Sequence, residues 1–178
     1  MKFEIKGKKI YIPDNYVSTD VKYAFARTLA RKIYMLLDCS IPVNIMRILR
    51  EFDVDVMFDY KSILTEKMDA AFLPVKREYS NGLIIIRKIP ERRMRFTLAH
   101  ELYHALLRPK TISFMMPNEL LKTHEREANI FASELLMPKQ KVYEAYSNGY
   151  NTPEKIANLF LVSLQAAKIR LKELNLLS

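Results

Sequence analysis

The sequence predicts an α+β fold that is mostly helical, with a small three-stranded sheet and a pair of short helices at the C-terminal end. Two observations carry this prediction. Three short apolar strand patterns follow one another before Pro90, whereas beyond it apolar residues recur at helical spacing almost to the end. The 178 residues, 49% of them hydrophobic and 28% charged, suit one folded domain with a small appendage and exclude a collagen-like or mostly disordered chain.

The first fifty residues predict a hairpin followed by two helices. Alternating residues around Gly7 indicate the hairpin, and an apolar stripe that begins at Val21 and recurs to Leu37 indicates a long buried helix. Ile41-Pro42 ends that helix. The expected elements are strands at residues 3–5 and 9–12, a helix from Ser18 or Thr19 to Leu37, and a helix at residues 43–52.

Three strands are expected next, at residues 54–58, 70–73 and 83–87. The first alternates valines with aspartates, the second ends before Pro74, and the third follows Asn81-Gly82, a strong turn dipeptide. Three short strands in succession predict a small antiparallel sheet. The third strand is expected either at an edge, where it pairs with an extended substrate, or in the interior of the sheet.

The second half predicts helices at residues 91–107, 119–135 and 139–147. Beyond them Thr152 and Ser163 are good N-caps, so residues 151–178 predict two short helices joined by Leu161-Val162. With no internal repeat and no long linker, we expect a main domain of residues 1–150 with residues 151–178 packed on it.

Charge and cysteine content set limits on the class of protein. The net charge of +9 is compatible with nucleic acid or an acidic protein partner; we interpret the basic clusters, Arg87 to Arg95 and Lys168 to Lys172, as solvated helix faces. Cys39 is the single cysteine, which excludes an intramolecular disulfide framework. The sequence has neither a signal-peptide pattern nor a long apolar run, so we expect a cytoplasmic protein with no membrane partner.

The segment His100-Glu101-Leu102-Tyr103-His104 lies inside a predicted helix and carries the chemistry. Residues four apart share one helix face, so both imidazoles can reach one Zn²⁺ ion while Glu101 lies beside its open position. Zinc lowers the pKa of a bound water, and a carboxylate near it can act as the catalytic general base. The pattern predicts a zinc hydrolase, since chance rarely gives this spacing with three histidines.

A catalytic zinc site needs a third protein ligand. Twenty residues after His104 the next helix offers Glu125, which completes a His-His-Glu site if that helix folds back across the first. Asn129, one turn later, would hydrogen-bond a ligand imidazole and fix its tautomer. Glu127 and His124 remain alternatives for the third ligand, and an ordinary exposed charged turn is the alternative without function.

Three segments together resemble one known family. They are residues 95–104 (Arg-Phe-Thr-Leu-Ala-His-Glu-Leu-Tyr-His), 125–132 (Glu-Arg-Glu-Ala-Asn-Ile-Phe-Ala) and 135–138 (Leu-Leu-Met-Pro), and they are similar to the ImmA/IrrE family of bacterial and phage zinc metallopeptidases. The resemblance implies a zincin-like domain with a helix-turn-helix-like segment. It also implies zinc ligands at His100, His104 and Glu125 with Glu101 as general base. Tyr103 departs from the small residue usual there, and is expected either to narrow substrate access or to pack outside.

The resemblance implies a narrow substrate class. Such proteins cleave or otherwise inactivate a helix-turn-helix repressor of a mobile element or stress response. The alternatives are a non-catalytic antirepressor that acts by binding, and a DNA-binding regulator. For the last, the helix-turn-helix-like tail offers Gln165, Lys168 and Lys172 to a DNA groove, although we favour packing or substrate recognition for this segment.

Overall fold

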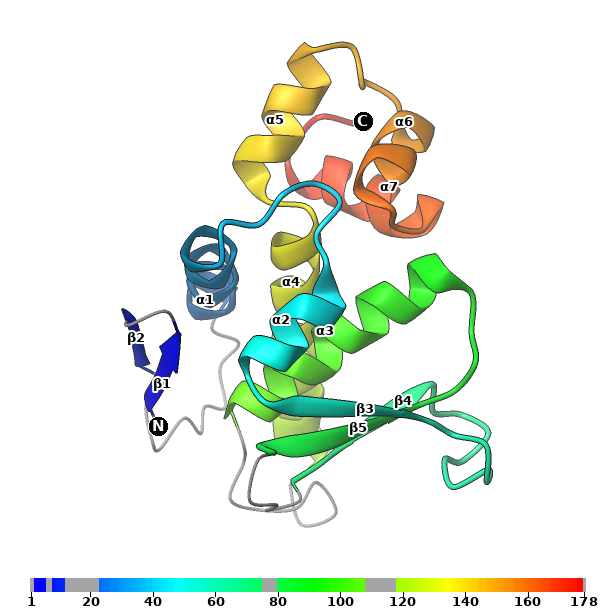
Figure 1. Cartoon of the computed structure of the whole chain (residues 1–178). Coiled ribbons are helices and arrows are strands. Elements are labelled where there is room, and N and C mark those ends of the chain that lie inside the picture. Colours follow the sequence, from blue (N-terminus) through cyan, green and yellow to red (C-terminus); the bar gives the residue numbers. More distant parts are fainter. Residues whose placement is uncertain (1, 6–7, 12–22, 75–79, 108–117, 178) are drawn as a thin grey trace.

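The computed structural model describes residues 2–5, 8–11, 23–74, 80–107 and 118–177 and places them in helices and two small sheets (Figure 1). In chain order the elements are β1 (Lys2–Ile5), β2 (Lys8–Tyr11), α1 (Tyr23–Leu36), α2 (Ile45–Glu51), β3 (Val54–Phe58), β4 (Ala70–Leu73), β5 (Gly82–Ile86), α3 (Glu91–Leu107), α4 (Asn118–Leu136), α5 (Lys139–Ser147), α6 (Pro153–Phe160) and α7 (Leu164–Glu173). The helices and strands follow the predicted order. The expected helix start at Ser18 or Thr19 lies outside the described residues.

The three-stranded sheet has the order β3-β5-β4 and mixed topology. β5 pairs antiparallel with β4 but parallel with β3, so the prediction of an antiparallel sheet is wrong for this second pair. Asn81 supplies the physical reason. Its main-chain N–H donates to the carbonyl of Asp53 over 2.6 Å and its side-chain amide to the carbonyl of Phe52 over 2.9 Å. These bonds hold the start of β5 beside the start of β3, which makes the two strands parallel.

Gly82 allows β4 to approach β5 closely. Its φ is +152°, and a Cβ atom there would collide with the ring of Phe72 on β4. Because β5 lies between β3 and β4, it is the interior strand of the sheet. The edge position expected as one alternative for residues 83–87 is wrong. In the described part of the sheet β4 is an edge strand, and it packs against α3.

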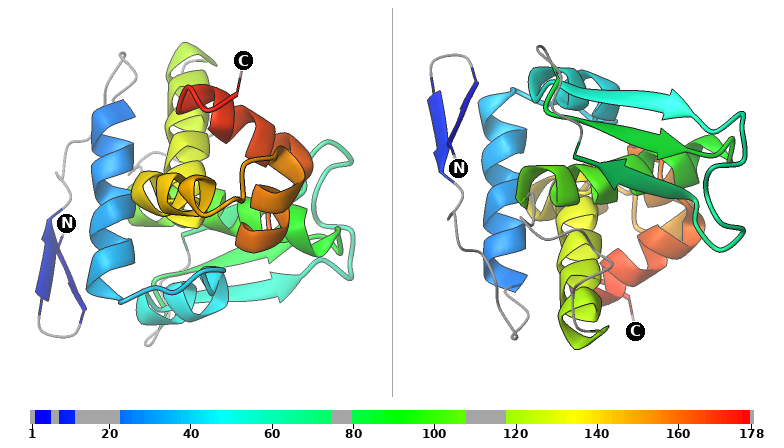
Figure 2. Two further views of the ribbon diagram at one scale, coloured as in Figure 1. Left: turned by 90° about the horizontal axis from the view of Figure 1, so that it is seen from above. Right: turned by 90° about the horizontal axis from the view of Figure 1, so that it is seen from below.

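α3 lies at the centre of the helical layer. It packs on the sheet together with α2, and α4 crosses it on the side away from the sheet, with α1 lying along α4 (Figures 1 and 2). Small residues of the two crossing helices, Ala99, Ala128 and Ala132, are completely buried, as suits close helix packing. Among the described helices, none combines the length and apolar character needed to cross a lipid bilayer.

The C-terminal helices α6 and α7 begin at the expected caps. The hydroxyl of Thr152 accepts the N–H of Lys155 over 3.3 Å, and that of Ser163 accepts the N–H of Ala166 over 3.1 Å. Between the helices, Leu161 adopts the left-handed conformation with φ 50° and ψ 50°. This conformation costs a non-glycine residue about 1–2 kcal/mol, so the packing of the tail has to hold it. The division of the chain at residue 150 stays a prediction.

A buried ion network joins the tail to the rest of the protein. Arg170 of α7 is 1% exposed, so the interpretation of its cluster as a solvated face is wrong at this residue. Its guanidinium donates to Glu134 of α4, to Glu173 over 3.0 Å and to the carbonyl of Met137 over 3.1 Å. Glu134, also 1% exposed, accepts a further hydrogen bond from Arg31 of α1 over 2.8 Å. One buried carboxylate therefore connects α1, α4 and α7.

We predict that Arg170→Ala lowers the free energy of unfolding by about 3–5 kcal/mol, because it leaves the charge of Glu134 buried with a weaker counter-charge. Lys172→Ala, an exposed neighbour on the same helix, should change it by less than about 0.5 kcal/mol. Urea unfolding followed by circular dichroism measures both. Equal stability of the two variants would contradict a structural role for the buried pair.

A second prediction concerns acid. Burial works to raise the pKa of Glu134, but the hydrogen bond from Arg31 and the charge of Arg170 outweigh it and hold the pKa below the ordinary 4.5. A carboxyl group with a lowered pKa in the folded state stabilises the fold at higher pH and loses that effect as pH falls. Glu134→Gln should therefore be clearly less stable than the parent chain at pH 7. The difference should shrink steadily below about pH 4.5, as urea titrations at several pH values would show; a difference independent of pH would contradict this.

Candidate metal centre

α3 brings the two histidines of the motif onto one face. The helix is continuous from Glu91 to Leu107, so His100 and His104 are one turn apart, and both side chains are mostly buried, at 14% and 20% exposure. Leu98, Leu102 and Leu106, on other faces of the helix, are buried in the core and fix its rotation. The imidazoles therefore point from a rigid helix toward α4.

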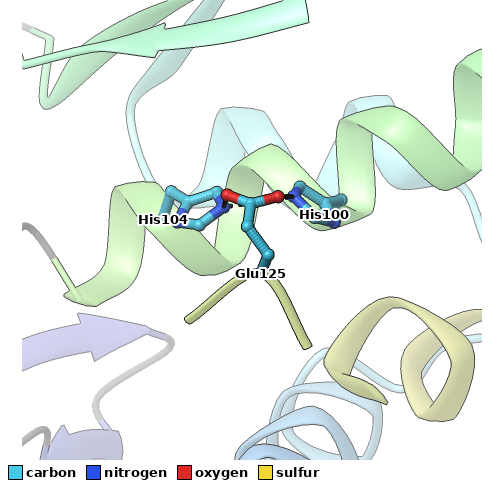
Figure 3. Close-up of side chains that lie close together, drawn as sticks. All are labelled: His100, His104 and Glu125. Atoms are coloured by element: carbon cyan, nitrogen blue, oxygen red, sulfur yellow. Dashed lines mark hydrogen bonds and ion pairs between the residues drawn. The ribbon is translucent and has the colours of Figure 1, made fainter. Parts of the chain in front are cut away.

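α4 supplies the third residue of the group. Nε2 of His100 lies 3.1 Å from Oε2 of Glu125, and Nε2 of His104 lies 3.2 Å from Oε1 of the same carboxylate. The two imidazole Nε2 atoms are 3.1 Å apart. Figure 3 shows the carboxylate spanning the space between the two rings.

The three side chains fit a zinc ion. Their ligand atoms all lie within 4.8 Å of one another, and two imidazole nitrogens with one carboxylate oxygen are a donor set that zinc hydrolases use. In a tetrahedral site with bonds of about 2.0–2.1 Å, two ligand atoms are about 3.3–3.4 Å apart. The three shortest separations between these residues are close to that distance, so they could hold a metal with little rearrangement.

The electrostatics of the three side chains favour one shared cation. Burial works to lower the pKa of His100, but the hydrogen bond and charge of Glu125 outweigh it and raise the pKa. Burial works to raise the pKa of Glu125, but the hydrogen bonds from both imidazoles outweigh it and lower the pKa far below its usual range. Glu125 is therefore ionised, and it attracts positive charge to the point where the two rings meet.

Glu101 lies beside this group and is 9% exposed. Burial raises its pKa, and the charges of His104 and His100 offset only part of that effect. The main-chain N–H of Phe72 on β4 donates a hydrogen bond to the carboxylate. Sequence reasoning missed this contact because the donor is a backbone group, which no residue type signals. A buried carboxylate with a raised pKa is suited to accept and return a proton near neutral pH.

Asn129 lies one helical turn after Glu125. Its Oδ1 is 3.0 Å from Nδ1 of His100. A proton on Nδ1 that is donated to this oxygen leaves Nε2 as the ring nitrogen whose lone pair is available to a metal ion. The amide therefore selects the tautomer of His100 that can bind a metal.

The other two candidates for the third ligand lie outside the group. Glu127 is completely buried, accepts the hydroxyl hydrogen of Tyr103 over 2.9 Å, and is 3.6 Å from Nδ1 of His124. Tyr103 is also completely buried and packs on Phe131, so it neither narrows access to the group nor packs outside the fold. The unusual tyrosine belongs to the core, where Glu127 satisfies its hydroxyl.

The residues proposed for DNA lie elsewhere. Gln165, Lys168 and Lys172 are exposed on α7 and do not join the His-His-Glu group. Of the upstream basic cluster, Arg95 donates to the carbonyls of Val43 and Leu161, and Arg92 donates to Asn158. Much of the basic charge thus holds loops and the tail in place.

Fold and site together define an α+β protein whose central helix carries a His-Glu-x-x-His candidate metal centre completed by a glutamate of the next long helix. The family model described as the IrrE N-terminal-like domain matches residues 50–172. The chain therefore belongs to the ImmA/IrrE family, and this membership supports a metallopeptidase.

Comparison with solved structures shows the same fold in a distant protein. A Mycobacterium tuberculosis transcriptional regulator superposes with a TM-score of 0.64 at 13% sequence identity, over 89% of this chain and 48% of that one. The chain thus spans about half the length of that regulator. No curated protein matches the sequence.

We predict that Asn129→Ala weakens zinc binding about 10–100-fold, because the loss of a partner that orients a ligand imidazole has this effect in metal sites. Ser133→Ala, one turn further along the same face, should leave the affinity unchanged. Competition with a chromophoric chelator measures both dissociation constants. Equal affinities for Asn129→Ala and the parent chain would exclude the orienting role.

Proposed function

We propose that the protein is a zinc-dependent endopeptidase that cleaves a specific protein in the cytoplasm. The observation that carries the proposal is the convergence of His100, His104 and Glu125, from two crossing helices, with Glu101 buried beside them. The match to the IrrE N-terminal-like domain supports peptide-bond hydrolysis as the reaction.

In this proposal each side chain has a separate task. His100, His104 and Glu125 would hold a zinc ion, which when bound would supply a Lewis acid and lower the pKa of water. Glu101 takes a proton from the attacking water and delivers it to the leaving amine nitrogen as the C–N bond breaks. The N–H of Phe72 keeps the carboxylate of Glu101 in place for both transfers.

Among the described strands only β5 pairs with β4, so the outer edge of β4 suits an extended substrate. Asp69 accepts the N–H of Arg87, the residue that follows β5, so alternate residues from Asp69 onward face β5. The main-chain groups of Ala70 and Phe72 then face away from β5; the N–H of Phe72 donates to Glu101, which leaves the two groups of Ala70 and the carbonyl of Phe72 for a peptide. A peptide added along this edge would pass beside the candidate metal centre. From the sequence, this role was expected for the neighbouring strand β5.

The proposed substrate is a helix-turn-helix repressor of a mobile element or stress response. The family resemblance supports this class, and the solved structure of like fold is a transcriptional regulator. Cleavage of the repressor and sequestration of the intact repressor can be distinguished, because only cleavage yields peptide fragments. Incubation of the protein with a candidate helix-turn-helix repressor, followed by mass spectrometry, separates them: fragments indicate cleavage, and an intact complex indicates sequestration.

We predict that Glu101→Gln retains zinc and loses at least about 100-fold in cleavage rate, since a general base contributes about 10²–10⁴-fold. His104→Ala should lose both zinc and cleavage. Zinc content by atomic emission and fragment formation on the same preparations provide the measurements. Full cleavage by Glu101→Gln would contradict the mechanism, and full zinc content in His104→Ala would contradict the site.

A further inference from the structure

A groove of about 480 Å³ opens between the tail and the catalytic helices. α3, α4 and α7 form its walls, and both views of Figure 2 show α7 lying beside α4. Phe96, Ile130, Ala166 and Ile169 give it a largely apolar lining. Ile169 is 56% exposed, so its side chain is accessible to a partner at the groove.

The groove adjoins the candidate metal centre. Asn129, which contacts His100, is one of its lining residues. Phe96 lies four residues before His100 on α3, which at 1.5 Å per residue places it about 6 Å along the helix from the ligand. Any side chain seated in the groove is therefore two or three extended residues away from the metal centre, since each spans about 3.3 Å.

Arg93 links the wall of the groove to the start of β4. Arg93, a residue of that wall, donates from Nε to the carboxylate of Asp69 over 2.6 Å, and Asp69 immediately precedes β4. A peptide that follows the edge past Ala70 would therefore meet the wall of the groove at Arg93, which gives one path from the edge past the candidate metal centre to the groove.

We propose that this groove binds an apolar side chain of the cleaved protein, near the scissile bond, and that α7 thereby determines substrate specificity. This inference rests on the proposed function for the identity of the bound protein. The occupant is a segment of a protein partner that carries a Leu-, Ile- or Phe-sized side chain. A volume of a few hundred Å³ with mostly apolar walls suits such a group.

Charge around the path adds a preference to the proposal. Lys122 and Arg126 are exposed on α4, one turn before and just after Glu125, and Lys168 and Lys172 are exposed on α7. Among the described residues none of these four cations has an ion pair, so acidic residues beside the apolar anchor would strengthen binding. Duplex DNA would also attract these cations, but it has no apolar side chain that could fill the groove. Gln165 and Ile169 of α7 line that groove, which favours a peptide over DNA as the occupant.

The test uses the full chain carrying Glu101→Gln, so that bound peptides are not cleaved. It measures binding of this chain to a positional-scanning array of short peptides and to a fluorescent duplex DNA of mixed sequence. The groove variant is Ile169→Glu, which places a charge among the apolar lining; because Ile169 is largely exposed, the fold should be retained. The matched control is Leu164→Glu on the same helix, where the leucine is 39% exposed and does not line the groove.

The expected result is that the array selects peptides with one apolar residue flanked by acidic ones. Ile169→Glu should weaken their binding about tenfold or more, whereas Leu164→Glu leaves it unchanged. Selection that survives Ile169→Glu would overturn the inference. A failure to bind any peptide would also overturn it, whether or not the chain binds the DNA through Lys168 and Lys172.

A cleavage measurement separates the groove from the reaction. The parent chain with zinc is given the peptides that the array selects. Cleavage near the apolar anchor supports both proposals. Groove-dependent binding without any cleavage would contradict the proposed peptidase activity and leave α7 as a determinant of partner binding.

Discussion

The structure depends on the close crossing of α3 and α4. The candidate metal ligands come from both helices, so their convergence requires that the two backbones approach within the reach of one glutamate side chain. Ala99, Ala128 and Ala132, small and completely buried residues of these helices, suit such close packing.

Packing outside the crossing holds this geometry. On one side the sheet supports α3, and β4 contributes the N–H group that orients Glu101. On the other side Glu134 of α4 joins α1 and α7 through two arginines. The same helix thus carries Glu125 of the candidate site near its middle and Glu134 of the buried ion network near its C-terminal end, so the tail stabilises α4 and simultaneously forms one wall of the groove.

The sequence predicted the helices well because their signals are local. Pro90 and Pro153 mark helix starts, Thr152 and Ser163 cap helices, and the helical period places His100 and His104 on one face. Strand pairing is a different problem, because alternation identifies a strand without naming its neighbour. The bonds from Asn81 to Phe52 and Asp53 decide the parallel pair, and they join residues almost thirty positions apart.

The burial and pairing of charged residues, at the site and in the tail, were also harder to predict, because they depend on partners distant in the chain. Arg170 follows the pattern of an exposed basic helix, and only the position of Glu134 in space makes it a core residue. Similarly, the choice of Glu125 over Glu127 depends on the side of α4 that faces α3, and the spacing from His104 left both open. The groove had no sequence signal, since its walls come from three helices distant in the chain.

The proposed zinc site is tested most simply by anomalous diffraction from crystals of the purified chain, recorded above and below the zinc absorption edge. We expect one zinc peak between Nε2 of His100, Nε2 of His104 and the carboxylate of Glu125, at bonding distance from all three. Zinc bound at another place, or zinc-soaked crystals with no peak between these atoms, would contradict it.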